Sequence, residues 1–178
     1  ERLGVKIILE QTPAESTALR FAKLDLKLMP DVARKYVKGH IDTGEIYYTN
    51  STQLNYQLAQ DPIEKVFREG AFHPMIKAGS ITHVWCGEKK PDPDALVSFV
   101  KKVFEKSENA QIAFSPEFTV CNDCDHIERG LLDECTTCGS HNDDGITRIT
   151  GYFTKTSSWN AGKRGELKDR YRKSVLAN

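Results

Sequence analysis

The sequence lacks several features that would place it in a membrane, an export pathway or a nucleic-acid complex. No apolar run approaches the ~18 residues of a membrane-spanning helix, and no basic stretch leading into an apolar one predicts a secretion signal. Lys plus Arg and Asp plus Glu number 25 each, so no global field attracts nucleic acid or an anionic membrane. We therefore expect a cytoplasmic protein that binds neither a membrane nor nucleic acid directly.

Internal repeats and low-complexity segments are also absent, and cysteine is scarce outside one region. Of the 5 cysteines, only Cys86 lies outside the stretch from Cys121 to Cys138. A chain of 178 residues with 39% hydrophobic residues can form a core without disulfides. Cys86, at the end of an expected strand, is typical of a small buried hydrophobic residue.

The four remaining cysteines form two pairs with metal-ligand spacing. Cys121-x-x-Cys124 and Cys135-x-x-Cys138 each bring two thiolates to one tight turn, and together they complete the tetrahedral sulfur shell that zinc prefers. His126 and His141 lie nearby but are not needed. An iron–sulfur cluster uses the same four thiolates, and the spacing does not exclude it. Disulfides or a thioredoxin-like redox pair fit the turn-rich, unexported sequence less well.

A glycine follows this four-cysteine knuckle. Taken alone, Gly151 would be a turn glycine beside a polar stretch. However, Arg148-Ile-Thr-Gly151-Tyr-Phe and the downstream Trp159-Asn-Ala-Gly-Lys, placed after such a knuckle, resemble the C-terminal glycyl-radical segment of anaerobic (class III) ribonucleoside-triphosphate reductases. Residues 10–18, 47–52 and 114–121 extend the resemblance, in order, over nearly the whole chain.

The resemblance implies a radical reductase. In that family an activase with a 4Fe–4S cluster and S-adenosylmethionine removes a hydrogen from the glycine Cα. The radical then passes to a cysteine that abstracts the ribose 3′-hydrogen, and the 2′-hydroxyl is lost. Here Gly151 would store the radical and the four cysteines would bind zinc. The implied partners are the activase, a ribonucleoside triphosphate, the N-terminal remainder of the reductase, which supplies the thiyl cysteine, and a second copy in a homodimer.

A strand-to-helix junction near the N-terminus suggests a substrate site. Thr12 as N-cap, Pro13 at the first helical position and Glu15 form a capping box, which predicts a helix through about Leu26. A helix start with free backbone N–H groups also suits a phosphate.

The resemblance gives this junction a function. It implies that the first turn holds the substrate phosphate through Ala14, Glu15, Ser16 and Thr17. It also implies that Asn50 and Ser51, after a short strand, line the substrate site.

The sequence pattern predicts an α/β fold. The resemblance implies the C-terminal half of a ten-stranded glycyl-radical barrel plus the small zinc knuckle, divided as a barrel segment (1–120), a metal module (121–145) and a radical loop with its tail (146–178). Residues 5–9 have the pattern of a buried strand that must pair with another polypeptide. Residues 166–173 are highly charged, which predicts a solvated tail.

Other elements follow from local signals. Asp61 and Asp92 are expected to cap helices, and strands are expected over residues 81–85 and, with a break at Pro116, 111–120. The second of these helices should bury one face, formed by Leu96, Phe99, Val100, Val103 and Phe104.

Two rival functions remain open. A stand-alone repair subunit for a damaged glycyl-radical enzyme would explain a short chain, but it needs neither the knuckle nor the phosphate motif. A non-enzymatic zinc ribbon that binds protein or nucleic acid would need a basic or aromatic face. The knuckle region is instead acidic, with Asp123, Asp125, Glu128, Asp133, Glu134, Asp143 and Asp144.

Overall fold

The computed structural model describes residues 3–58, 61–87 and 90–170. The helices are α1 (Glu15–Leu28), α2 (Pro30–Ala33), α3 (Pro62–Gly70), α4 (Pro93–Lys106) and α5 (Ala161–Asp169), with 3-10 turns at His73–Met75 and Thr156–Ser158. The strands are β1 (Lys38–His40), β2 (Glu45–Tyr47), β3 (Thr82–Gly87), β4 (Ile112–Pro116), β5 (Phe118–Cys121), β6 (Ile127–Arg129), β7 (Asp143–Arg148) and β8 (Phe153–Lys155).

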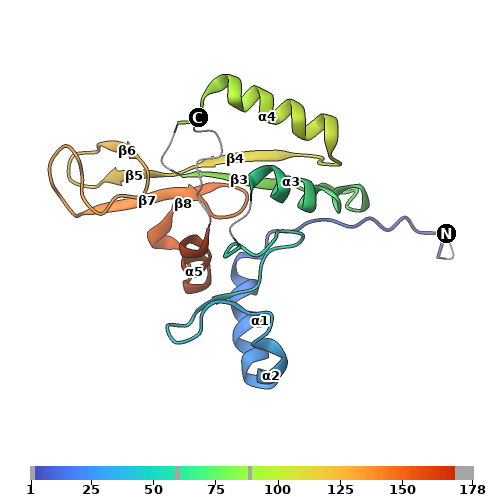
Figure 1. Ribbon diagram of the computed structural model, residues 1–178. Helices are drawn as coiled ribbons and strands as arrows, with labels where there is room; N and C mark the ends of the chain where they lie inside the picture. Colours follow the sequence, from blue (N-terminus) through green and yellow to red (C-terminus); the bar gives the residue numbers. More distant parts are fainter. Residues whose placement is uncertain (1–2, 59–60, 88–89, 171–178) are drawn as a thin grey trace.

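These strands form three sheets. β1 and β2 make an antiparallel hairpin, β3 and β4 are parallel, and β6-β5-β7-β8 form an antiparallel sheet that protrudes from the body (Figure 1). A parallel pair needs a crossover, and α4 supplies it. The α/β class is confirmed, whereas the three sheets of the described residues do not confirm the predicted half of a ten-stranded barrel.

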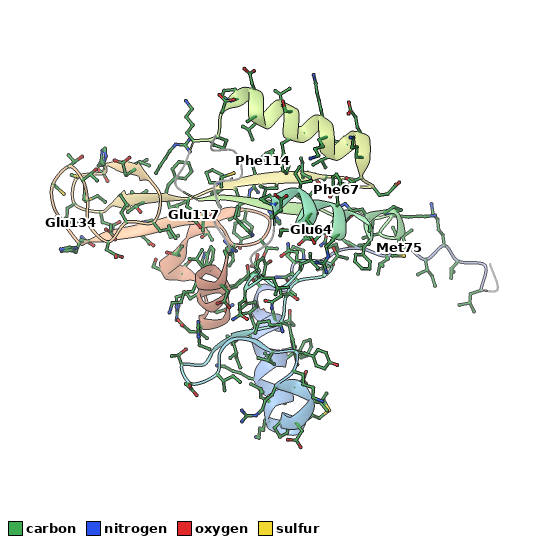
Figure 2. All side chains as sticks on the ribbon, viewed as in Figure 1. Glu64, Phe67, Met75, Phe114, Glu117 and Glu134 are labelled. Atoms are coloured by element: carbon green, nitrogen blue, oxygen red, sulfur yellow. The ribbon has the colours of Figure 1, made fainter. Side chains whose placement is uncertain are left out.

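The main core lies between the parallel strands and helices α3 and α4. Val66, Val84, Phe99 and Val103 are buried there, and Phe67 and Phe114, labelled in Figure 2, pack against them. Asp61 and Asp92 cap α3 and α4 as predicted: an Asp61 carboxylate oxygen accepts from Ile63 N at 2.8 Å, and one of Asp92 accepts from Ala95 N at 2.9 Å. The strands after these helices are confirmed, with the break directly after Pro116, at Glu117.

The predicted buried face of α4 is too wide. Phe99 and Val103 are buried, but Phe104 is 50% exposed. Phe104 lies five residues after Phe99, which at about 100° per residue turns it well away from the core-facing side.

The start of α1 differs from the predicted capping box. The N-cap is Ala14 rather than Thr12, and no side chain caps the helix. The amide oxygen of Asn50 accepts from Ala14 N at 2.8 Å, so a residue 36 positions away satisfies this N–H. A tertiary contact therefore sets where the helix begins, and the helix ends at Leu28, close to the predicted position.

The prediction of a buried strand at residues 5–9 is wrong for the chain by itself. These residues belong to no strand, and Ile7 is 80% exposed. The segment extends away from the body (Figure 1), touching it where Ala78 N donates to Leu9 O at 3.0 Å. No strand among the described residues lies beside it, so its backbone groups have no ladder to join.

The prediction of a solvated tail is also wrong within the described residues. Glu166 and Arg170 are only 1% and 2% exposed, because α5 packs against the β1–β2 hairpin and α1. A Cβ at Gly162 would lie 2.7 Å from Ile46 O, and one at Gly165 would collide with Glu45 O, so these glycines let α5 approach β2 closely. Residues 171–173 lie outside the described part. No helix in the described ranges is long and apolar enough to cross a membrane.

Candidate functional site

The four cysteines of the knuckle converge at one end of the antiparallel sheet. Their sulfur atoms all lie within 4.8 Å of one another, with Cys121 Sγ 3.6 Å from Cys138 Sγ and Cys124 Sγ 3.7 Å from Cys135 Sγ. Four sulfurs about 2.3 Å from a tetrahedral zinc would be about 3.8 Å apart. All four are free cysteines, so the structure supports a metal site rather than disulfides.

Each Cys-x-x-Cys pair is closed by the same turn. The N–H of Asp125 donates to Cys121 O at 3.1 Å, and the N–H of Gly139 donates to Cys135 O at 2.9 Å. Asp125 and Gly139 both have positive φ, at 58° and 71°. This left-handed residue after each second cysteine turns the chain back so that both thiols of a pair face the same point.

Side-chain hydrogen bonds join the two halves of the knuckle. Asp123 accepts from Ser140 Oγ at 2.5 Å and from Asn142 Nδ2 at 2.6 Å. His126 and His141 bond elsewhere, to Glu128 at 3.3 Å and Asp133 O at 2.6 Å, and they are not part of the sulfur cluster. The labelled Glu134 in Figure 2 lies on this loop, at the far end of the sheet from α3.

Gly151 lies at the tip of the β7–β8 hairpin. Arg148 pairs with Phe153 and Ile149 N donates to Tyr152 O at 3.0 Å, which leaves Thr150 and Gly151 as a two-residue tip. The Gly151 carbonyl accepts from Arg148 Nη1 at 2.5 Å. β7 also pairs with β5, whose last residue is a metal-site cysteine, so the same sheet carries the knuckle and the glycine.

The conformation of Gly151 does not require a glycine. Two-residue hairpin tips usually need positive φ, but neither Thr150 nor Gly151 has it. A Cβ at Gly151 would meet nothing within 4 Å. Each of the other 11 glycines has either a positive φ or a neighbour that would lie closer than 3 Å to an added Cβ. Neither sterics nor backbone geometry therefore explains this glycine.

A pocket brings Gly151 together with three segments that are distant in sequence. It is lined by Gln11, Thr12, Pro13, Asn50, Ser51, Gln53, Ile81, His83, Thr150 and Gly151. Ser51 adopts a positive φ of 45°, unusual for a residue other than glycine. Three candidates from the sequence, Asn50, Ser51 and Gly151, thus lie around one cavity.

The pocket wall contains buried polar atoms without a hydrogen-bond partner. They are Asn50 Nδ2, Gln53 Oε1, His83 Nε2 and Thr150 Oγ1, on side chains no more than 8% exposed. A buried polar atom left unpaired costs about 1–3 kcal/mol. Four such atoms around one cavity make it a candidate site for a polar molecule.

The remaining predicted substrate residues are beside the pocket rather than in its wall. Ala14 N donates a hydrogen bond to Asn50, which lines the pocket. Glu15 and Thr17 are half-buried and Ser16 is exposed on the first turn of α1, which begins directly after Ala14.

Gln53, His83 and Thr150 also line the pocket, although the sequence pattern does not mark them as candidates. The sequence pattern predicts a half-buried His83, but the residue is 1% exposed and stacks on Trp85 with ring centroids 5.2 Å apart. Strand alternation places His83 on one face of β3, but only the tertiary structure shows that this face lines the pocket.

His83 is expected to make the protein less stable in mild acid. Burial, reinforced by cations including Lys65 and Arg170, lowers the pKa of His83 to about 3 from 6.5. In the unfolded chain His83 therefore becomes protonated below about pH 6.5, whereas in the folded chain it becomes protonated only near pH 3. Stability is lost as the pH falls through this window, by up to about 1.4 kcal/mol per pH unit.

Denaturant unfolding at pH 7 and pH 5 checks this expectation. His83→Gln should lose less stability between the two pH values than the parent protein does. Burial also lowers the pKa of His73. Because His73 is present in both proteins, its contribution to the stability loss cancels in the difference. Equal losses for parent and variant would contradict the assignment.

Comparisons with known proteins point to one family. Residues 1–172 match the family model of anaerobic ribonucleoside-triphosphate reductase. Curated relatives with that name include those of Enterobacteria phage T4 (29% identical; 96% of this chain and 28% of the relative), Escherichia coli (27%; 96% and 24%) and Haemophilus influenzae (26%; 94% and 24%). The chain thus spans about a quarter of the length of these relatives.

Solved structures share the fold. One, titled anaerobic ribonucleotide reductase, superposes with a TM-score of 0.73 at 22% identity, over 96% of this chain and 25% of the other. A second, the anaerobic ribonucleotide reductase of Thermotoga maritima in complex with dATP and CTP, gives 0.68 at 21% identity, over 93% and 25%. Because the family model matches nearly every residue, this chain belongs to the anaerobic ribonucleoside-triphosphate reductase family.

Proposed function

We propose that this chain supplies the radical glycine, the zinc site and part of the substrate site of an enzyme that reduces ribonucleoside triphosphates to deoxyribonucleoside triphosphates under anaerobic conditions. The observation that carries the proposal is the pocket, in which Gly151 faces Asn50, Ser51 and a set of unpaired buried polar atoms. The family membership of the chain gives the reaction class.

Gly151 is the proposed radical store. A Cα radical is stabilised when the adjacent nitrogen and carbonyl share one plane with it, and a side chain hinders that planarity. Gly151 is exposed, its Cα faces open space and its conformation suits any residue, so chemistry at Cα is the remaining reason for a glycine there. An activase with a 4Fe–4S cluster and S-adenosylmethionine would need this access to remove the Cα hydrogen.

Zinc is the proposed occupant of the knuckle. Cys121, Cys124, Cys135 and Cys138 offer the sulfur spacing that a tetrahedral ion needs, and zinc has no redox chemistry of its own beside a radical. With all four positions filled by protein ligands, the site is of the structural kind. Its role is to fix the sheet from which the Gly151 hairpin extends.

The first turn of α1 is the proposed phosphate-binding element. The N-terminal N–H groups of a helix have no partners within the helix and attract anions. No side chain caps α1, and Ser16 and Thr17 add hydroxyl groups to that turn. The pocket next to it would then take the sugar, with Asn50, His83 and Thr150 as hydrogen-bonding groups of its wall.

Asn50→Ala is expected to weaken nucleotide binding by about tenfold, since it removes the amide from the pocket wall and releases the Ala14 N–H that sets the start of α1. Equilibrium binding of a ribonucleoside triphosphate measures the change. Gln57→Ala is the matched control, because Gln57 is exposed and bonds to Asp169 away from the pocket. Equal affinity in parent and Asn50→Ala would remove Asn50 from the substrate site.

Residues upstream of this chain in its relatives would complete the enzyme. We propose that they supply the thiyl cysteine and the strands that close the barrel, including a partner for residues 5–9, whose apolar side chains are exposed here. Cys86 does not take the thiyl role, because it is not among the residues that line the pocket shared by Gly151. A homodimer of the complete polypeptide is part of the same proposal.

Anaerobic electron paramagnetic resonance tests the function. The complete reductase, loaded with zinc, is mixed with activase, reductant and S-adenosylmethionine, and then exposed to air. We expect a glycyl doublet, lost in oxygen as the chain is cut at Gly151, and deoxyribonucleotide formation only in samples that gave the doublet. If zinc-loaded enzyme with active activase gives no doublet, the radical assignment fails and a non-enzymatic zinc module becomes the better description.

A further inference from the structure

Helix α5 and its C-cap residue, Arg170, carry a cluster of buried charges outside the pocket. Lys163, Glu166 and Arg170 are 2%, 1% and 2% exposed. The Glu166 carboxylate accepts from Lys163 Nζ at 2.6 Å and from Arg170 Nη2 at 2.8 Å. Two cations therefore share one carboxylate in the interior, and buried cations need further acceptors for their N–H groups.

Those acceptors are the two carbonyl groups just before the hairpin tip. Arg170 Nη1 donates to Arg148 O at 2.8 Å, and its Nη2 donates to Ile149 O at 3.0 Å. Lys163 Nζ donates to the same Ile149 O at 3.3 Å. These charge-assisted bonds fix the backbone two and three residues before Gly151.

Arg170 is itself held in place by aromatic rings. Its guanidinium carbon lies 3.8 Å from the ring centroid of Trp85 and 5.2 Å from that of Trp159. Trp85 is also the ring on which His83 of the pocket wall stacks. The guanidinium thus contacts Trp85 on β3, beside the pocket wall, as well as the backbone of the hairpin.

The start of α5 contacts the other side of the pocket. Asn160 caps α5 by accepting from Lys163 N at 3.0 Å, and its Nδ2 donates to Glu15 O, in the first turn of α1, also at 3.0 Å. One short helix therefore bonds to the backbone at both the glycine hairpin and the start of α1.

We propose that Lys163, Glu166 and Arg170 are positioning residues that hold Gly151 at a fixed place relative to the start of α1. Buried ion pairs add little to net stability compared with apolar packing, whereas a fixed geometry between a reacting group and its substrate contributes strongly to rate. The positioning of the hairpin is a property of the fold, and its importance for radical chemistry rests on the proposed function of Gly151.

The test compares Arg170→Lys with the parent in the complete, zinc-loaded reductase. Lysine keeps the positive charge but loses the planar fork that reaches two carbonyls and stacks on the rings. Ile149 N, bonded to Tyr152 O, reports on the tip. We expect hydrogen exchange of the 147–153 segment to be about tenfold faster, with zinc content near the parental value and a modest drop in melting temperature. Turnover should fall with the nucleotide KM unchanged.

Lys168→Gln is the matched control, because Lys168 is on the same helix, is 59% exposed and pairs with Glu45 rather than with the hairpin.

If Arg170→Lys does not fold, Lys163→Met removes one of the three bonds to the carbonyls and should give a smaller change of the same kind. Parental exchange and turnover in a folded Arg170→Lys would overturn the proposal. Absence of a glycyl doublet in the parent would instead overturn the function of Gly151 and leave the exchange result to decide positioning.

Discussion

Gly151→Ala is expected to abolish the glycyl doublet, the oxygen-dependent cleavage and nucleotide reduction while leaving the fold intact. The stability should change by no more than about 0.5 kcal/mol, the usual range for an exposed site without special geometry. The physical reason is that the added methyl group meets nothing within 4 Å and the backbone φ suits alanine. Turnover should fall by more than about a thousandfold, the scale expected when an essential group of a catalytic unit is removed.

A second glycine provides the matched control. Gly145 lies on β7 of the same sheet, where a Cβ would come within 2.8 Å of Leu131 Cδ2 and 2.9 Å of Thr156 Oγ1. Gly145→Ala should therefore lower the melting temperature but leave a doublet in the folded fraction. Circular dichroism and radical yield per folded chain separate the two effects. A Gly151→Ala protein that still gives the doublet, or that no longer folds, would contradict the assignment.

Cys121→Ser is expected to release the metal and unfold the antiparallel sheet. Cys121 is 2% exposed, ends β5 and pairs with Asp143 of β7, so it joins the metal to the strand that leads to Gly151. The binding free energy of a structural zinc is about 10–16 kcal/mol and is also folding free energy. We expect zinc content to drop from about one per chain to near zero, with proteolysis opening within residues 118–155.

Cys86→Ser is the control for this substitution. Cys86 is also buried, but it lies on β3, outside the sulfur cluster. It should retain the metal and lose only modest stability from placing a hydroxyl in an apolar position. A chelator should reproduce the effect of Cys121→Ser in the parent protein. Retention of one zinc by Cys121→Ser, with a protected sheet, would show that the knuckle does not depend on the metal.

Local chemistry explains why some predictions from the sequence are confirmed. The knuckle is set by two short spacings, and its four sulfurs converge as expected. The caps of α3 and α4 depend on Asp61 and Asp92, each within three residues of the N–H group it accepts from. The resemblance to anaerobic ribonucleoside-triphosphate reductases, carried by motifs around Gly151, is confirmed by the family match.

Predictions failed where a distant partner decides the outcome. The start of α1 depends on Asn50, and the burial of Glu166 and Arg170 depends on the β1–β2 hairpin and two tryptophans. Composition alone predicts that a charged helix is solvated, because it does not reveal that the charges neutralise one another and bond to backbone carbonyls. The prediction for residues 5–9 failed for the opposite reason: their pattern suits a strand, but the described residues offer no strand to pair with.

The sequence by itself determined the candidate metal-ligand set, the candidate glycine and the family, because each depends on residue type and short spacing. Only the tertiary structure decided that Gly151 shares a pocket with Asn50, Ser51 and His83. It also decided that Arg170, at the end of α5, hydrogen-bonds to the backbone of the hairpin. The physical reason is that a pocket is formed by side chains from strands, helices and turns that are far apart in the chain. Their meeting depends on packing and hydrogen bonds that no local pattern records.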